Sequence, residues 1–312
     1  MTERLIVIIG PTAVGKTKLS IDLAKKFNTQ IISGDSMLVY KGLDVGTAKP
    51  SLAERDGVMH HLIDILEPAA EFNVVDFRNY AQKLITQINN TGHIPILAGG
   101  TGLYVRALLE GYRFSQAPGD EVLRQKLADL AAEQGNEYLH TLLAKVQPDT
   151  AARLHPNDLR RIIRALEVFY VSGETVSQDK TAPTELLYNA AVIGLTMDRA
   201  RLYERINRRV DIMVEQGLVD EVARLLQQGV LPGCQAMRGI GYKEIIEHLS
   251  EGKELATAVE QVKQATRNFA KRQLTFYRRM SYITWFDVDN FGNYNNLLEA
   301  IYKYVAGKFC IR

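Results

Sequence analysis

A glycine-rich segment near the N-terminus has the residue types and spacing of a phosphate-binding loop. Residues 10–17 read Gly-Pro-Thr-Ala-Val-Gly-Lys-Thr and match the Walker A pattern without a mismatch. In such a loop, backbone N–H groups surround phosphate oxygens, the lysine supplies a mobile positive charge, and the last hydroxyl binds Mg²⁺. The sequence therefore predicts phosphate binding by Gly10, Pro11, Thr12, Ala13, Val14, Gly15, Lys16 and Thr17, with Thr17 as a metal ligand.

A carboxylate and a hydroxyl follow two other expected strands. Asp35 comes soon after a short strand expected at residues 30–33, and Thr101 follows the apolar residues 94–98. A carboxylate at the carboxyl end of a strand beside the phosphate loop faces the ligand crevice of a doubly wound sheet, where Asp35 can accept a proton or hold a metal through water. Two plainer alternatives remain open: Asp35 as the N-cap of a following helix, and Thr101 as part of a tight turn without chemistry.

The strand before Thr101 ends in Ala-Gly-Gly rather than in an acidic residue. ATPases and GTPases with a phosphate loop often have an Asp or Glu at this position, where it is the Walker B ligand of the metal. Its absence argues against nucleotide hydrolysis. Small residues instead let the backbone and the Thr101 hydroxyl approach a leaving oxygen or a nucleophile.

The elements that must position these residues alternate between strands and helices. Leu5–Ile9 is a continuous aliphatic run, typical of a strand in a parallel sheet that is covered on both faces. Lys18–Phe27 has the 3.6-residue period of an amphipathic helix. This alternation predicts an α/β fold with a parallel sheet of the P-loop type and helices on both faces.

The middle of the chain interrupts this alternation. Strand signals vanish after Asp120, and residues 121–170 are expected to be helical, with breaks near Gly135 and Pro148. Residues 190–197 and 282–288 are expected to return as strands. We therefore predict an inserted helical subdomain at residues 117–188, and a catalytic core with C-terminal helices formed by residues 1–116 and 189–312.

Composition limits the classes of protein to which the chain can belong. Its 312 residues are 46% hydrophobic and 24% charged, with no apolar run of the roughly 18 residues that a membrane span needs and no export signal. Its two cysteines, and six histidines without metal-ligand spacing, argue against a structural zinc site and predict a cytoplasmic protein. Because the net charge is only +2, a nucleic-acid site would need local clustering of basic residues.

Further motifs extend well beyond the phosphate loop. Together with the segments above, they resemble the bacterial tRNA dimethylallyltransferases, also called tRNA isopentenyltransferases or the IPP transferase family. The matching segments are residues 33–50, 60–62, 98–104, 154–158, 164–168, 240–244 and 270–275, with Arg161. Two departures are Leu38, where the family usually has Gln in a segment that touches the target base, and Phe276-Tyr277, where Trp-Phe is common.

The resemblance implies a prenyl transfer to tRNA. Dimethylallyl diphosphate would place its diphosphate on the phosphate loop, which in other proteins holds ATP, with Mg²⁺ and Lys16 stabilising the leaving group. The N6 amine of the adenosine on the 3′ side of the anticodon would attack while Asp35 accepts its proton and Thr101 bonds the leaving oxygen. Arg205 and Arg209 match a family element, and one of them would reach the diphosphate; alternatively, they form a surface pair with Glu204 or Asp211.

The resemblance also implies a tRNA anticodon stem-loop as the second substrate, with its adenosine flipped into a channel in the core. Two expected helices, at residues 259–279 and 159–170, each place basic side chains on one face. Solvated helix faces commonly carry such charges as well. The predicted tRNA contacts are Asp35, Ser36, Met37, Leu38, Thr101, Arg124, Arg160, Arg161, Ile162, Ile163, Arg164, Lys263, Arg267, Lys271 and Arg278.

Two other functions remain open from the residues alone. A P-loop kinase of a nucleoside or another small metabolite explains the phosphate loop and Asp35 as a base, but it has no use for the basic helices. A non-catalytic, nucleotide-dependent RNA-binding protein would tolerate the loss of Asp35 and Thr101. The resemblance implies a monomer, and nothing in the sequence demands a partner chain.

Overall fold

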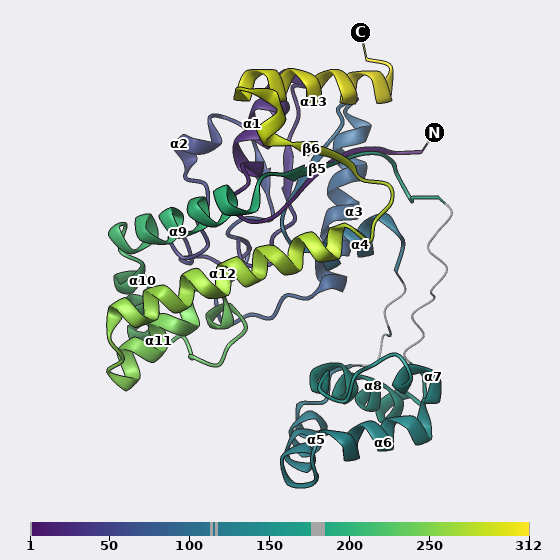
Figure 1. Ribbon diagram of the computed structural model, residues 1–312. Helices are drawn as coiled ribbons and strands as arrows, with labels where there is room; N and C mark the ends of the chain where they lie inside the picture. Colours follow the sequence, from purple (N-terminus) through teal and green to yellow (C-terminus); the bar gives the residue numbers. More distant parts are fainter. Residues whose placement is uncertain (1, 113–114, 116–117, 176–184, 312) are drawn as a thin grey trace. The chain divides into compact units, whose positions relative to one another are not determined.

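Figure 1 shows the computed structural model, which describes residues 2–112, 115, 118–175 and 185–311. The chain divides into two compact units, one formed by residues 1–111 and 185–312 and the other by residues 112–184. The larger unit contains one parallel sheet with the strand order β3-β2-β4-β1-β5-β6. Its strands are β1 (Arg4–Ile9), β2 (Ile31–Ser33), β3 (His60–His61), β4 (Ile96–Ala98), β5 (Asn189–Thr196) and β6 (Thr284–Asp287).

Strand β1 lies in the middle of this sheet and is covered on both faces. Its side chains alternate between two hydrophobic clusters, with Leu5, Val7 and Ile9 in one and Ile6 and Ile8 in the other. All five are fully buried. The predicted parallel sheet with helices on both faces is therefore confirmed.

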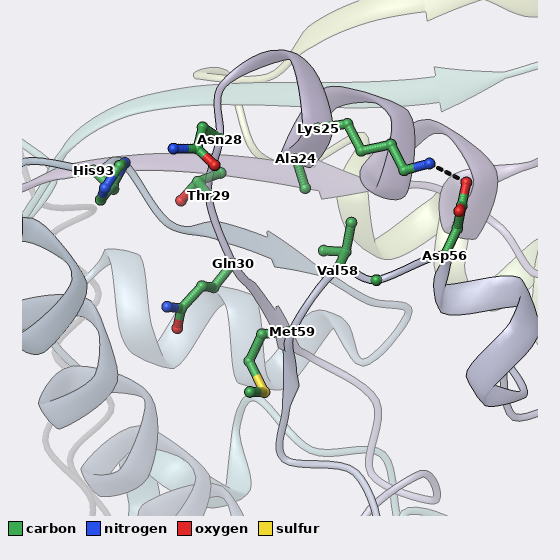
Figure 2. Close-up of a pocket in the computed structure, with 10 residues that line it drawn as sticks. Ala24, Lys25, Asn28, Thr29, Gln30, Asp56, Val58, Met59 and His93 are labelled. Carbon is green, nitrogen blue, oxygen red and sulfur yellow. Dashed lines mark hydrogen bonds and ion pairs between the residues drawn. The ribbon is translucent and has the colours of Figure 1, made fainter.

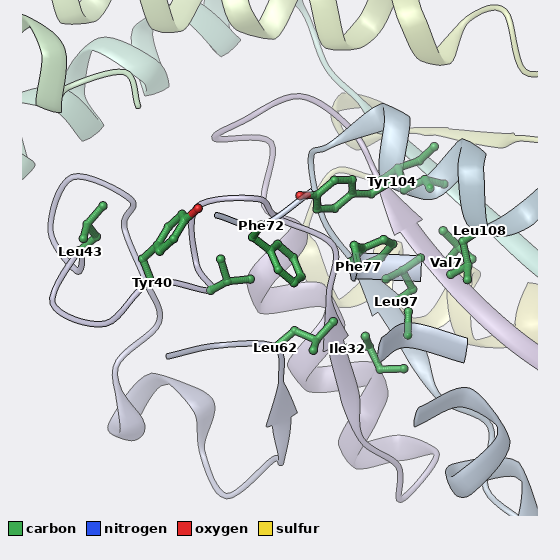
Figure 3. Close-up of a cluster of buried hydrophobic side chains, with 14 of the residues drawn as sticks. Val7, Ile32, Tyr40, Leu43, Leu62, Phe72, Phe77, Leu97, Tyr104 and Leu108 are labelled. Carbon is green, nitrogen blue, oxygen red and sulfur yellow. The ribbon is translucent and has the colours of Figure 1, made fainter. Parts of the chain in front are cut away.

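Nine α-helices belong to the described part of the larger unit. Helices α3, α4 and α10 contribute to the first cluster, part of which is drawn in Figure 3, whereas α1 and α13 contribute to the second; α12 has residues in both. Their bounds are α1 (Lys16–Lys26), α2 (Leu52–Arg55), α3 (Val74–Asn90), α4 (Gly102–Leu109), α9 (Arg199–Glu215), α10 (Leu218–Gln227), α11 (Tyr242–Glu251), α12 (Leu255–Tyr277) and α13 (Tyr294–Phe309).

The connections bring three loops to one edge of the sheet. The chain leaves β1 for β2, which lies beyond β4, and leaves β4 for β5, which lies beyond β1. Neighbouring strands whose connections diverge in this way open a crevice at their carboxyl ends. The loops after β1, β2 and β4, which carry residues 10–15, Asp35 and Thr101, therefore meet at the carboxyl edge.

The smaller unit is helical and has its own hydrophobic core. Its helices are α5 (Glu121–Gln134), α6 (Asn136–Val146), α7 (Pro148–Ala151) and α8 (Leu159–Ser172). The breaks near Gly135 and Pro148 were predicted, whereas the break at residues 152–158 was not. Leu127, Leu139, Leu143 and Leu166 lie in this core.

The limits of the insertion differ in part from the prediction. The predicted first boundary, between residues 116 and 117, falls on residues outside the described part of the chain. At the second boundary, residues 185–188 cluster with the larger unit rather than with the insertion. The reason is that the Leu187 N–H donates to the Leu109 carbonyl (2.9 Å) and Tyr188 is buried in the first hydrophobic cluster. Among the described helices, none has the length and apolar character needed to cross a membrane.

Candidate active site

The loop after β1 has the backbone of an anion-binding loop. Gly10 and Gly15 have positive φ values of 149° and 109°, and a Cβ at Gly10 would lie only 2.7 Å from the Leu195 carbonyl oxygen. Gly15 is the N-cap of α1 and offers no side-chain acceptor to the first turn of the helix. The amide groups at this helix N-terminus are therefore left for an anion.

Lys16 lies over this loop. Its Nζ donates to the carbonyl oxygens of Gly10 (2.9 Å) and Pro11 (2.7 Å). Burial and the charge of Arg209 lower the pKa of Lys16 to about 7, although the Asp35 carboxylate opposes this shift. The ammonium group is therefore poorly compensated within the protein, and an anion in the loop would stabilise its charged form.

Arg205 and Arg209 reach the same place from α9. A Cβ on Gly15 would lie 4.0 Å from the Nη2 of Arg205. Burial lowers the pKa of Arg209, the Asp35 carboxylate raises it, and Arg205 lowers it further, so these groups lie close together. The surface-pair alternative is wrong, because neither arginine forms an ion pair with Glu204 or Asp211; Asp211 pairs with Lys263 instead.

Asp35 faces the cationic groups from the loop after β2. Its Oδ1 accepts the Met37 N–H at 2.8 Å, and no helix follows, so the alternative of a helix N-cap is wrong. Within the described residues, its other carboxylate oxygen has no hydrogen-bond partner. Ser36, Met37 and Leu38 are half-buried beside it. One carboxylate oxygen is thus held in place while the other is available for chemistry.

Thr101 joins the loops after β2 and β4. Its Oγ1 accepts the Ser36 N–H (3.2 Å), and its own N–H donates to the Gly34 carbonyl (3.2 Å). A Cβ on Gly99 would lie 2.3 Å from the Gly34 backbone, which explains why small residues end β4. Thr101 is also the N-cap of α4, so the predicted tight turn exists and in addition fixes the segment that carries Asp35.

Gln273, which the sequence analysis did not single out, bridges two of these loops. Its Oε1 accepts the Thr12 N–H, and its Nε2 donates to the Gly100 carbonyl, both at 2.8 Å. The side chain is only 5% exposed. The available signal was a polar residue on the apolar face of α12, between the buried Ala270 and Tyr277.

Glu221 is a second buried polar residue that was missed. Its carboxylate accepts the N–H groups of Asp44, Val45 and Gly46 at 2.8–3.0 Å, and the Tyr242 hydroxyl at 2.6 Å. It therefore fixes the long loop after β2 against α10 and α11. Here too the signal was a charge on the apolar face of a helix, next to Leu218 and Val222.

The predicted basic stripe of α12 separates into two halves. In the first half, Lys263 pairs with Asp211 (2.6 Å), and Arg267 pairs with Glu260 (2.8 Å). In the second half, Lys271 and Arg278 are exposed and form no ion pair with any described residue. A shallow cavity of 340 Å³ lies along this second half, lined by Asn268, Lys271, Arg272, Thr275, Phe276 and Arg279.

In the helical unit, one buried carboxylate holds two of the predicted RNA-binding arginines. Glu167 is fully buried and pairs with Arg124 (2.9 Å) and Arg164 (2.6 Å). Burial acts to raise the pKa of Glu167, but hydrogen bonds from Arg164 and the Asp120 amide lower it overall. Both arginines therefore have fixed positions.

Other predicted contacts of this unit differ in exposure. Arg160 and Arg161 are exposed, and Ile163 is half-buried. The side chain of Ile162 is fully buried in the helical core, so the prediction that it contacts tRNA is wrong for the side chain. The physical reason is helical geometry, which turns this position of α8 toward Leu166 and the other core residues.

A larger cavity, of 460 Å³, lies at the opposite edge of the sheet (Figure 2). Thr29, Met59 and His93, which line it, come before β2, β3 and β4, and so lie near the amino ends of these strands. Lys25 and Asp56 form an ion pair on its rim. None of the predicted site residues lines this cavity, so cavity size does not identify the site.

Comparisons with known proteins identify the family of the chain. The family model described as IPP transferase matches residues 38–280. The tRNA dimethylallyltransferase of Geobacillus thermodenitrificans is 51% identical to this chain, covering 99% of it and 98% of the relative. These findings give no support to the kinase alternative.

Two solved structures are also similar. The full-length tRNA isopentenylpyrophosphate transferase of Bacillus halodurans has a TM-score of 0.73 and 45% identity, covering 98% of this chain and 96% of that one. A eukaryotic dimethylallyltransferase acting on tRNA has a TM-score of 0.78 and 31% identity, covering 92% of this chain and 74% of that one. From its sequence, its fold and these relatives, the chain belongs to the IPP transferase family.

Proposed function

We propose that this protein transfers a dimethylallyl group from dimethylallyl diphosphate to the N6 amine of the adenosine on the 3′ side of the anticodon in tRNA. The observation that carries the proposal is the meeting of the phosphate loop, Lys16, Arg205 and Arg209 with one carboxylate, Asp35, at the carboxyl edge. Three positively charged side chains next to free backbone amides at a helix N-terminus form a suitable binding site for a diphosphate.

The leaving group would be stabilised by the phosphate loop. Amide groups at the N-terminus of α1, with Lys16 and the two arginines, face the charge that grows on the diphosphate as the C–O bond breaks. Lys16 would exchange its contacts with the Gly10 and Pro11 carbonyls for phosphate oxygens. Cleavage of the allylic bond thus releases diphosphate into a site that already carries positive charge.

The acceptor would be activated from the opposite side. As the N6 nitrogen forms its bond to the allylic carbon, its proton passes to the carboxylate oxygen of Asp35 that accepts no hydrogen bond from a described residue. Thr101 holds the Asp35 segment through the Ser36 amide. Its hydroxyl lies at the carboxyl edge, where we propose that it bonds the leaving oxygen.

The residues at the loop fit Mg²⁺ held mainly by ligands from outside the protein. Thr17 is exposed in the first turn of α1, and the described residues contain no cluster of three His, Cys, Asp or Glu side chains. Mg²⁺ usually keeps several waters and binds substrate phosphates with one or two protein oxygens. We propose that Thr17 supplies such an oxygen, and that the ion neutralises charge on the leaving group when it is bound.

The tRNA would bind through cations that no acidic side chain neutralises. Among the predicted contacts, Lys271 and Arg278 in the larger unit and Arg160 in the helical unit are exposed and form no ion pair with a described residue. Each phosphate contact adds affinity that depends on salt but not on base sequence. We propose that the anticodon stem-loop is the part bound, that the protein acts as a monomer, and that it works in the cytoplasm, in keeping with its two free cysteines.

The test is a transfer assay with labelled donor. Purified protein, Mg²⁺, dimethylallyl diphosphate and an anticodon stem-loop with adjacent adenosines should yield labelled RNA, with the label on N6 by nucleoside analysis. A stem-loop with guanosine in place of the target adenosine is the matched control and should stay unlabelled. Unlabelled RNA together with ATP-dependent phosphorylation of a nucleoside would overturn the proposal in favour of the kinase.

A further inference from the structure

Lys49 is a buried basic residue that the proposed reaction does not use. Only 4% of its side chain is exposed, whereas lysine is seldom buried in proteins unless it is paired. Its Nζ donates to the backbone carbonyl of Tyr40 at 2.7 Å and forms ion pairs with Asp44 (2.6 Å) and Asp64. The ammonium group therefore joins three separate points of the long loop region after β2.

The first of these points lies one turn away from Asp35. The N–H of Tyr40 donates to the Met37 carbonyl at 3.3 Å, so residues 37–40 form a turn. The N–H of Met37 in turn donates to Oδ1 of Asp35 at 2.8 Å. A displacement of Tyr40 would therefore move the amide that holds the Asp35 carboxylate.

The second point, Asp64, holds the middle of the same turn. Its N–H donates to the Leu38 carbonyl at 3.1 Å, while its carboxylate pairs with Lys49 and lies 3.7 Å from Arg55. Asp44 and Asp64 contact the same Nζ, so their carboxylates lie close together. Without the ammonium group between them, the two like charges would repel each other and push Asp64 away from the turn.

The loop that carries Lys49 has an anchor of its own. Glu221, which is 3% exposed, accepts the N–H groups of residues 44–46 at 2.8–3.0 Å. A Cβ on Gly46 would lie only 2.6 Å from the ring of Tyr242, so this loop packs closely against α11. Lys49 therefore acts on the turn from a fixed position.

We infer that Lys49 is a positioning residue for prenyl transfer, which holds the turn of residues 37–40 so that Asp35 keeps its available oxygen directed at the acceptor nitrogen. The inference rests on the proposed function, in which Asp35 accepts the proton. Thr101 fixes the start of this segment through the Ser36 amide, and Lys49 fixes its end. A misplacement of about 1 Å that arises far from the reacting atoms can lower a rate by about 100-fold.

The test separates catalysis from donor binding in the full chain. Lys49→Met retains the length of the side chain but removes the ammonium group, and kcat in single-turnover transfer at saturating stem-loop should fall by roughly 10- to 100-fold. Pyrophosphate binding, measured by calorimetry in Mg²⁺ buffer, should not change, because the phosphate loop and its cations are untouched. Lys49→Arg can still bond a carbonyl and a carboxylate together, and should recover kcat to within about fivefold of wild type.

A matched control and a second variant keep the result decisive. Lys41 lies in the same region but is exposed and pairs with Glu67 at 2.6 Å, so Lys41→Met should leave kcat within about twofold of wild type. If Lys49→Met does not fold, Asp64→Asn removes one charged partner of Lys49, and asparagine tolerates the left-handed backbone at this position (φ 57°). In this variant kcat should fall by about threefold.

Each contrary outcome has a separate meaning. An unchanged kcat in folded Lys49→Met, or in Asp64→Asn where Lys49→Met does not fold, overturns the inference and leaves the proposed function standing. Loss of pyrophosphate binding together with kcat also overturns it, because Lys49 would then support the fold as a whole. Absence of transfer by wild type overturns the proposed function, and this inference with it.

Discussion

The two edges of the sheet both carry basic and acidic side chains, but they arrange the charges differently. At the amino edge, Lys25 pairs with Asp56 beside the larger cavity. At the carboxyl edge, Lys16, Arg205 and Arg209 surround the phosphate loop, and among the described residues none of them forms an ion pair. Keeping like charges close together without an opposite charge lowers the stability of the fold, and such arrangements are typical of functional sites. Uncompensated charge, rather than cavity volume, therefore marks the site.

The largest expected effect contrasts one aspartate from each edge. Asp35→Ala removes the proton acceptor, and we expect kcat for prenyl transfer to fall by roughly 10³-fold, in the range measured for general bases. Asp56→Ala, at the amino edge, should leave kcat within about twofold of wild type, because an exposed ion pair contributes little. Single-turnover kinetics with labelled donor measures both.

Binding of tRNA checks that the Asp35 variant is intact. Filter binding of the stem-loop should give Asp35→Ala an affinity close to that of wild type. Near-normal turnover in this variant would remove Asp35 from the mechanism and weaken the distinction between the two edges.

A smaller effect is expected from the arginines of α9. Arg209→Ala should weaken pyrophosphate binding by roughly 10- to 100-fold, because a partly buried charge-assisted contact is lost. Arg201 lies on the same helix but pairs with Asp289, so Arg201→Ala is the matched control and should bind normally. Equal affinities for the two variants, measured by calorimetry, would show that α9 does not take part in diphosphate binding.

The pH dependence of pyrophosphate binding follows from Lys16. Since its pKa is lowered to about 7, the free protein loses this charge as the pH rises above 7, and binding must then take up a proton. Affinity should fall by up to about tenfold per pH unit between pH 7 and 9.

Lys16→Arg separates this effect from the protonation of pyrophosphate itself. Arginine stays charged over the whole range, whereas the ligand titrates equally in both proteins. The ratio of the two affinities should therefore change with pH. A constant ratio would mean that Lys16 keeps its charge in the free protein.

The smallest expected effect concerns the two halves of α12. Lys271→Ala should weaken stem-loop binding a few-fold and reduce its salt dependence by about one counterion. Lys263→Ala should change neither quantity, because Lys263 is already paired with Asp211. Affinities measured at several salt concentrations test the difference. An equal loss in both variants would show that the ion pair opens when RNA binds.

Much of the fold could be predicted because its signals lie in contiguous residues. The aliphatic run of β1, the glycine spacing of residues 10–17, and the breaks at Gly135 and Pro148 are local patterns, and the structure has each of them. Strand β3 has only two residues, too few to show a period, and it was not predicted. Residues 185–188 were assigned to the insertion because what joins them to the core, a hydrogen bond to Leu109 and the burial of Tyr188, involves residues distant in the sequence.

The candidate site was only partly accessible to the same reasoning. Asp35 and Thr101 were found because each follows a strand, which places both at the carboxyl edge. Whether a cation remains free depends instead on which acid lies opposite it, and Lys263 meets an acid on another helix. For the same reason, the sequence could not decide whether Arg205 and Arg209 face the diphosphate or pair with acidic residues on the helix surface.

The sequence by itself determined the phosphate loop, the alternation of strands and helices, and the family. Only the tertiary structure decided which charges are neutralised and which buried polar side chains join the loops. The bond between Thr12 and Gln273 links residues 261 positions apart. A hydrogen bond depends on distance in space, and no local pattern encodes the distance between two residues that far apart in the chain.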